Sequence, residues 1–182
     1  MEHRTAEELA AGLDAIRRSP RGTGRVELVV RRPAVGEREV LDEGRLDLAV
    51  GLVGDTWDQR PSARTDDGGP HPDMQLNIMN AAAAALIAGA RERWPLAGDQ
   101  LYVDLDIGVD ALPEWTKLRI GTAVIEITDQ PHTGCAQFSQ RFGVDALRFV
   151  NSPDGKAVRA RGVNARVVEP GLVRPGDEIA VL

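Results

Sequence analysis

The sequence predicts a mainly β protein, a barrel or a sandwich with helical insertions. Many short segments alternate apolar and polar residues between turn residues, and only two segments have clear helical character. The 19 glycines and 11 prolines among 182 residues indicate many turns. A chain of this length usually forms one domain with a full core. Because only 4% of the residues are aromatic, we expect aliphatic side chains to fill it.

The N-terminal segment predicts a helix over residues 6–18. Thr5 and Glu8 have the spacing of a capping box, and Leu9, Leu13 and Ile16 follow at helical intervals. Serine, proline and glycine over residues 19–24 end this helix. We therefore expect residues 1–24 to form an N-terminal helix and linker, and residues 25–182 to form the β domain.

The rest of the chain predicts short strands around one long loop and one further helix. The predicted strands cover residues 26–30, 37–41, 44–50, 100–107, 158–168 and 179–182, with a strand–turn–strand unit about Gly121 over residues 117–128. Residues 51–73 are rich in glycine, proline and aspartate and predict a long loop. The alanine-rich residues 77–93, stopped by Pro95, predict a helix that lies outside the β core as an insertion.

Charge and apolar content exclude some function classes. The net charge of −6 disfavours a general nucleic-acid or membrane-surface binder, because both surfaces are polyanionic. Residues 141–166 are an exception, with six basic and two acidic residues. This segment could receive a small anion, or its charges could be solvated strand faces. The longest apolar run, residues 81–90, is too short to span a bilayer, and residues 1–18 lack a signal-peptide core. We expect a soluble cytoplasmic protein.

Cys135 is the one cysteine of the chain, so no internal disulfide can form. Phe138 and Phe142 follow at helical spacing, and Gly143 is a natural helix terminator. With Thr133 or Gly134 as N-cap, Cys135 falls in the first turn of a helix, where unpaired N–H groups favour a thiolate. We expect it to face a pocket. The alternative is a small buried hydrophobe.

Other familiar chemistries lack their sequence patterns. His3, His71 and His132 do not have zinc-ligand spacing with the cysteine. The chain has no G-x-S-x-G elbow, no G-x-G-x-x-G after a strand and no phosphate-binding P-loop. Asp104 and Asp106 alternate with apolar residues, which is typical of the solvent-exposed face of a strand rather than of a metal cluster.

Five segments, taken in chain order, resemble bacterial stand-alone members of the MOSC domain family, the family of the C-terminal domain of molybdenum cofactor sulfurases. They are residues 51–57 (GLVGDTW), 98–101 (GDQL, where many members have GENL), 118–128, 135–143 with Cys135 and RFG, and the closing strands within 161–179. The resemblance covers about residues 25–182. Relatives often carry a basic, histidine-rich stretch after the glycine–aspartate loop, whereas residues 55–73 hold several acids and only His71.

The resemblance implies a mostly antiparallel β-barrel with N-terminal and inserted helices. It also implies binding of molybdenum cofactor, an anionic pterin dithiolene with a phosphate. Cys135 would be the catalytic residue and the molybdenum ligand. The expected cofactor-binding residues are Thr133, Gly134, Arg141, Arg159 and Arg161, with Arg159 and Arg161 on one face of a strand.

The implied reaction is the reduction of N-hydroxylated compounds with electrons from a separate redox partner protein, because the chain carries no flavin, haem or iron–sulfur motif. A non-redox sulfur carrier or cofactor-delivery module that uses a Cys135 persulfide is the alternative. A degenerate domain with a structural role is the third interpretation.

Overall fold

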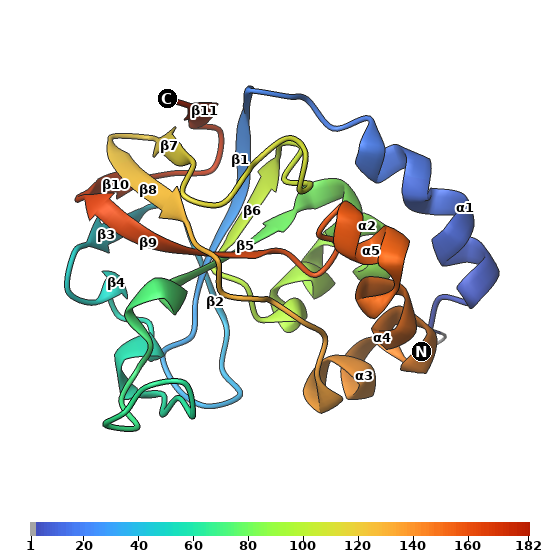
Figure 1. The fold of residues 1–182 in the computed structure, drawn as a ribbon, viewed down its shortest axis with the longest axis horizontal. Helices are drawn as coiled ribbons and strands as arrows, with labels where there is room; N and C mark the ends of the chain where they lie inside the picture. Colours follow the sequence, from blue (N-terminus) through green and yellow to red (C-terminus); the bar gives the residue numbers. More distant parts are fainter. Residues whose placement is uncertain (1–2) are drawn as a thin grey trace.

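The computed structural model describes residues 3–182, and its centre is a closed barrel of seven strands (Figure 1). In spatial order the barrel strands are β11 (Glu178–Val181), β7 (Lys117–Ile120), β8 (Ala123–Ile127), β9 (Val163–Glu169), β5 (Leu76–Asn80), β6 (Leu101–Asp104) and β1 (Thr23–Arg31). Pairing of β1 with β11 closes the ring, and the short β2 (Glu39–Leu41) extends from β1. The predicted barrel is confirmed.

The β5–β6 pair is parallel, while every other strand pair of the barrel is antiparallel. A parallel pair needs a crossover connection, and α2 (Ala81–Ala88) with the 3₁₀ segment η3 (Arg91–Ala97) supplies it. The predicted helix over residues 77–93 is therefore partly wrong. Its first four residues belong to β5, a strand of the barrel wall, and Asn80 then caps α2 by accepting a hydrogen bond from Ala83 N at 2.9 Å.

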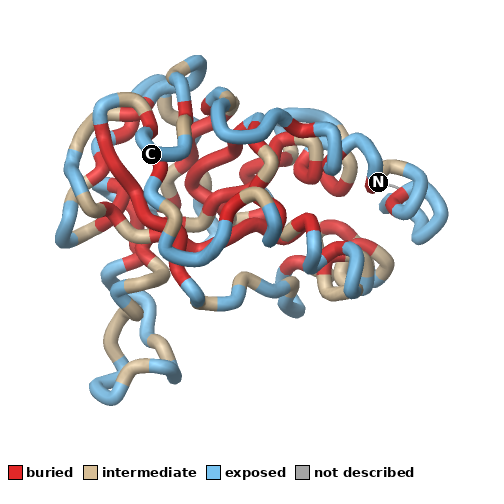
Figure 2. The backbone as a smooth tube through the Cα atoms, turned by 45° about the horizontal axis from the view of Figure 1, so that its top comes forward, coloured by how far each residue is buried: buried red, intermediate tan, exposed pale blue. Residues whose placement is uncertain are grey.

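The molecule has two hydrophobic clusters, one inside the barrel and one between the barrel and its helices. The inner cluster is wholly aliphatic, as the scarcity of aromatic residues predicts. On β1 the side chain of Val29 joins the inner cluster, whereas Leu28 and Val30 join the outer one, as strand alternation requires. Tyr102, Phe138 and other aromatic residues lie in the outer cluster. Figure 2 shows both buried layers in red.

The helices gather on one side of the barrel (Figure 1). Helix α1 (Ala6–Arg17) begins with the predicted capping box and buries the three apolar side chains that follow it. It packs against α2 and α4. The remaining helices are α3 (Ala136–Phe142), α4 (Val144–Asn151) and α5 (Pro153–Ala157).

The predicted loop over residues 51–73 contains little regular structure. Short strand β4 (Gly51–Leu52) begins it and pairs with β3 (Gly44–Asp47), which also pairs with β10 (Gly171–Val173). Two 3₁₀ turns, η1 (Trp57–Gln59) and η2 (Pro72–Met74), bracket a segment that projects from the barrel (Figure 1).

The strand predicted over residues 158–168 begins later than expected. β9 starts at Val163, because α5 and a turn occupy residues 153–161. Gly162 directly precedes β9 and has a φ of +104°. The strand–turn–strand unit about Gly121 is confirmed, with φ +55° at that glycine.

Candidate functional site

Cys135 is the residue immediately before helix α3. Its backbone is extended (φ −124°, ψ 179°), and its side chain is exposed and makes no capping hydrogen bond. The preceding residue is held by Asn151 at the end of α4. The Asn151 side chain accepts a hydrogen bond from Gly134 N at 3.1 Å and donates one to Gly134 O at 3.4 Å. The backbone before the cysteine is therefore fixed, while the thiol itself is open to solvent.

The predicted helix start is confirmed, one or two positions later than expected. Cys135 is itself the N-cap, in place of Thr133 or Gly134. The expectation that Cys135 shares one helical face with Phe138 and Phe142 is wrong, because both phenylalanines are buried and the cysteine is exposed. The alternative of a buried hydrophobic cysteine is wrong for the same reason.

His132, Asp99 and Arg161 form a buried polar group beneath the cysteine segment. Arg161 Nη1 donates to Asp99 Oδ2 at 2.6 Å, and His132 Nδ1 lies 3.6 Å from Asp99 Oδ1. Burial raises the pKa of Asp99, although the Arg161 cation opposes the shift. Burial, with the nearby Arg161 and Arg32 cations, holds the pKa of His132 well below its usual range. His132 is therefore neutral at neutral pH.

Arg32 and Asp55 form a second buried ion pair, with side chains 2% and 0% exposed. Arg32 Nε and Nη2 each donate to the carboxylate at 2.7 Å. Asp55 also accepts from the backbone N–H of Trp57 at 2.9 Å. The glycine–aspartate loop of the family is thus fixed to the end of β1 by a bidentate pair, the geometry in which guanidinium and carboxylate match best.

Four arginines from three parts of the chain converge on the carbonyl end of η3. They donate to four consecutive carbonyl oxygens: Arg38 to Pro95 (3.1 Å), Arg141 to Leu96 (2.6 Å), Arg161 to Ala97 (2.9 Å) and Arg32 to Gly98 (3.0 Å). The last carbonyls of a helix lack partners within it and favour positive charge. The family's Gly98-Asp99-Gln100-Leu101 segment starts where these contacts end.

Arg32, Arg38, Arg60 and Arg141 form what we call the arginine cluster. Partial burial lowers the pKa of Arg38, and the Arg141 and Arg32 cations lower it further. Arg60 is exposed as a residue, yet the protein around its charge lowers its pKa to about 10, with Arg32 adding to the shift. Within residues 3–182 the Arg60 side chain makes no hydrogen bond or ion pair, and only its backbone N–H donates, to Trp57 O at 3.0 Å. Positive charge here exceeds the single opposing carboxylate of Asp55.

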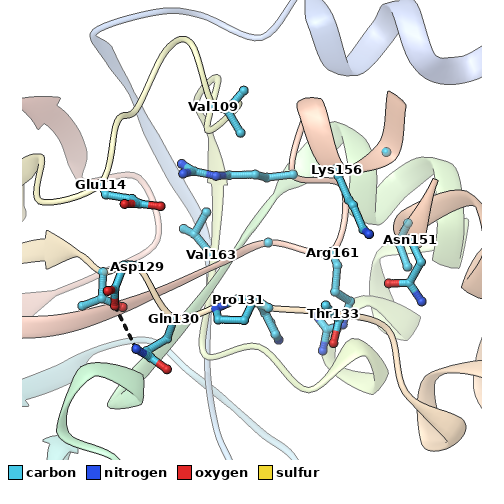
Figure 3. A pocket seen from close by; sticks show the side chains of 16 residues that line it. Val109, Glu114, Asp129, Gln130, Pro131, Thr133, Asn151, Lys156, Arg161 and Val163 are labelled. Atoms are coloured by element: carbon cyan, nitrogen blue, oxygen red, sulfur yellow. Dashed lines mark hydrogen bonds between the residues drawn. The ribbon is translucent and has the colours of Figure 1, made fainter. Parts of the chain in front are cut away.

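Two cavities belong to the candidate site, one at the arginine cluster and one beside the cysteine segment. The smaller, about 180 Å³, is lined by Arg32, Arg60, His71 and Asn77 among others and belongs to the arginine cluster. The larger, about 370 Å³, is lined by Glu114, Asp129, Thr133, Lys156 and Arg159 among others. In Figure 3, Lys156 and Asn151 lie on one side of the larger cavity, opposite Glu114 and Asp129. Cys135 itself lines neither of these two cavities.

The structure separates the residues that the sequence placed together. Thr133, Arg159 and Arg161 line the larger cavity. Gly134 does not line it but is hydrogen-bonded to Asn151, which does. Arg141 points instead to the carbonyl end of η3. The expectation that Arg159 and Arg161 share one face of a strand is wrong, because both lie in the turn before β9.

Several residues of the site were missed from the sequence: Arg32, Arg38, Asn151, Lys156 and Glu114. Only Arg32 had a usable signal, since an arginine at the end of an apolar strand needs a carboxylate partner when buried. The predicted Asp55 loop was such a partner.

The fold and the site define a class of protein: a closed β-barrel domain that exposes one cysteine and carries a cluster of arginines. The sequence matches the MOSC domain over residues 71–180, and the chain belongs to this family, which is associated with molybdenum cofactor binding. No curated protein matches the sequence significantly.

Solved structures share the fold. YuaD from Bacillus subtilis is 18% identical, with a TM-score of 0.61 over 88% of this chain and 96% of that protein. YiiM from Escherichia coli is 20% identical, with a TM-score of 0.56 over 87% of this chain and 69% of that protein. At this identity the likeness concerns the fold alone.

Within residues 3–182, the helices are all too short or too polar to cross a membrane.

Proposed function

We propose that this protein binds molybdenum cofactor, with Cys135 as the molybdenum ligand and the arginine cluster as the receiver of the cofactor's phosphate. The observation that carries the proposal is the build of helix α3. Cys135 caps its start, and Arg141, a member of the arginine cluster, lies in its last turn. A soft ligand and an anion-binding surface are thus joined by seven residues of one helix.

The donor chemistry fits this cofactor. A thiolate is a suitable ligand for a soft metal centre, and guanidinium groups match phosphate oxygens in paired hydrogen bonds. Within residues 3–182, His, Cys, Asp and Glu side chains form no group of three or more that could hold a metal alone. A metal that brings its own dithiolene ligands needs only one further protein ligand, which an exposed thiol supplies.

The protein's own residues would bind and orient the cofactor. Arg60 has uncommitted donors and a destabilised charge, so an arriving phosphate would relieve its repulsion from Arg32. Arg38 and Arg141 each have guanidinium nitrogens left over after capping η3. Asn151 fixes the backbone before the cysteine, so the thiol approaches the metal from a defined position. When bound, the cofactor would supply two-electron redox chemistry.

The reaction we propose is reduction of an N-hydroxylated compound to its N–H form, with release of water. It consumes two electrons and two protons, and the electrons would come from a separate redox protein. The exposure of Cys135 supports this arrangement, since a partner can approach the site directly.

The same exposure favours one other candidate, a persulfide carrier. A terminal sulfur on Cys135 could be loaded and removed by partner proteins without opening the fold. This function needs the thiol but not the arginine cluster.

Metal analysis of protein made in a cofactor-producing host tests the proposal. We expect bound molybdenum and pterin in the wild type and loss of molybdenum in Cys135→Ser. The melting temperature should not change, because the side chain is exposed. Gln137→Ala, at another exposed position two residues later, is the control and should keep full molybdenum content.

Full molybdenum in Cys135→Ser would refute the role of the cysteine. Mass spectrometry of the same wild-type protein separates the two candidates. Added sulfur on Cys135 in protein without molybdenum would favour the carrier.

A further inference from the structure

The larger cavity differs from the arginine cluster in its charge balance. Two cations, Lys156 and Arg159, and two carboxylates, Glu114 and Asp129, line it. The fifth charged residue, Arg161, is already neutralised by Asp99. The arginine cluster has excess positive charge and suits an anion, whereas the lining of this cavity has no net charge. The two cavities are therefore built for different ligands.

Lys156 and the two carboxylates lie on opposite sides of an apolar floor, while the charge of Arg159 interacts with that of Glu114. Lys156 stands on one side, Glu114 and Asp129 on the other, and Val163 lies between them (Figure 3). Val109 and Val150 add to the apolar lining. Among the described residues, neither Lys156 nor Glu114 forms an ion pair within 4 Å. The Lys156 charge is therefore available to a ligand, and Glu114 is opposed only at longer range, by Arg159.

The backbone around the cavity is strained. Within residues 3–182 only two non-glycine residues have positive φ, Arg159 at 47° and Trp115 at 67°. Arg159 lines the cavity, and Trp115 directly follows Glu114. Side-chain hydrogen bonds hold Arg159 in this conformation, since its Nη1 donates to Ile107 O at 3.3 Å and to Leu112 O at 2.5 Å. Such conformations persist only where the surroundings enforce them, and they cluster at ligand sites.

Unsatisfied polar atoms lie in the wall of the same cavity. Within the described part of the chain, His132 Nδ1 and Arg161 Nε are buried without hydrogen-bond partners, and both residues line the cavity. The wall also leads to the cysteine, because Thr133 lines the cavity and Asn151 bonds to Gly134. A molecule in the cavity would therefore lie against the segment that presents Cys135.

We propose that this cavity binds a small zwitterion with an apolar middle, its carboxylate at Lys156 and its amine or amidine at Glu114 and Asp129. Its role as the substrate recess rests on the proposed function, but the binding itself does not. The recess assigns Arg159 to the substrate rather than to the cofactor. It limits substrates to compounds whose cationic or N-hydroxylated end is separated from an anionic end by an alkyl chain.

Binding to cofactor-free protein tests the recess without reference to activity. The probe is 6-aminohexanoate, followed by calorimetry or by amide chemical shifts. Hexanoate and hexylamine are the matched single-charge controls. We expect the zwitterion to bind more tightly than either control, and its affinity to fall about threefold or more in Lys156→Gln and in Glu114→Gln, as for loss of one partly exposed charge pair. Both positions are exposed, so both variants should fold.

Two further measurements sharpen the test. Lys117→Gln removes an exposed lysine that does not line the cavity and should leave the affinity unchanged. The exchange Glu114→Lys with Lys156→Glu should bind the zwitterion more tightly than either single exchange but less tightly than the wild type, because Asp129 stays beside position 114 and opposes the reversed carboxylate. No binding of the probe, binding of hexanoate as tight as that of the zwitterion, or equal loss in the Lys117 variant would each overturn the proposal.

The outcomes are distinct from those for the cofactor. Probe binding in a protein that never acquires molybdenum would leave the recess standing and refute the proposed function. Molybdenum that depends on Cys135, with no probe binding, would do the reverse.

Discussion

Nδ1 of His132 lies 3.6 Å from Oδ1 of Asp99, and both atoms are buried with no hydrogen-bond partner among residues 3–182. The two residues come from the cysteine segment and from the segment capped by the four arginines. Their contact thus joins the segment that precedes Cys135 to the segment whose carbonyl oxygens the four arginines hold. The contact places two titratable groups in the interior, so their protonation should change the free energy of unfolding.

We predict that His132 makes the protein less stable in mild acid. The pKa of His132 is lowered in the folded state, so below about pH 6.5 the unfolded chain binds a proton that the folded chain does not. Stability is then present above pH 6.5 and is lost as the pH falls towards the folded pKa, by up to about 1.4 kcal/mol per pH unit. Urea unfolding at several pH values should show this slope, and His132→Gln should reduce it. Parallel pH profiles of the two proteins would contradict the prediction.

Asp99 acts in the opposite direction. Its pKa is raised in the folded state, so its contribution falls as the pH rises above about 3.8 and through its folded pKa. The difference between wild type and His132→Gln removes this shared background and isolates the histidine.

Gly162 should not tolerate a side chain. A Cβ there would lie 2.4 Å from Ile78 O and 3.2 Å from both His132 Nδ1 and Asp99 Oδ1, and φ is +104°. Gly176, with φ +94° and open space around it, is the matched control for the backbone strain alone. We expect Gly176→Ala to cost about 1–3 kcal/mol of unfolding free energy and Gly162→Ala clearly more. Equal losses in chemical denaturation would show that the close approach at Gly162 is unimportant.

The local sequence predicted most of the fold because its signals are local. Strand alternation, the capping box at Thr5 and the turn at Gly121 each lie within a few residues. The failure at residues 77–80 has a physical reason. The eight residues that follow them form helix α2, and their alanine content extended the predicted helix too far towards the N-terminus. Asn80 is a natural N-cap and marks the true start of the helix. Burial in the barrel wall then makes residues 76–80 a strand.

The candidate site was less predictable because its contacts span long sequence distances. Cys135 stood out as the one cysteine, and the family's segments were recognisable in order. The pairs Arg32–Asp55 and Asp99–Arg161 join residues 23 and 62 positions apart. The division at residue 24 stays a prediction, and so do the cofactor-binding roles of Thr133 and Gly134.

The Arg32–Asp55 pair should contribute far more to stability than the neighbouring Arg31–Glu39 pair. The first is buried, whereas the side chains of the second are 34% and 46% exposed. Asp55→Asn leaves the Arg32 cation buried without its counterion, and we expect a loss of about 3–5 kcal/mol. Glu39→Gln should cost less than about 1 kcal/mol. Urea unfolding of both variants measures the contrast, and a small loss for Asp55→Asn would mean that water reaches Arg32.

Arg60 should lower the stability of the anion-free protein and raise its affinity for an anion. Its charge is repelled by Arg32 and is partly desolvated, and within residues 3–182 it has no ion-pair partner. Arg60→Gln removes this repulsion, so the anion-free variant should melt at the same temperature as the wild type or higher. The same change removes a guanidinium that would bind phosphate, so the affinity for pyrophosphate should fall about tenfold, the loss of one charged hydrogen-bonding group. Thermal unfolding with increasing pyrophosphate measures both effects, since a ligand stabilises in proportion to the logarithm of its excess over Kd.

Arg45→Gln, at an exposed position on β3, controls for net charge and should change neither quantity. An Arg60 variant that is less stable yet binds pyrophosphate normally would mean that this arginine supports the loop and does not receive an anion.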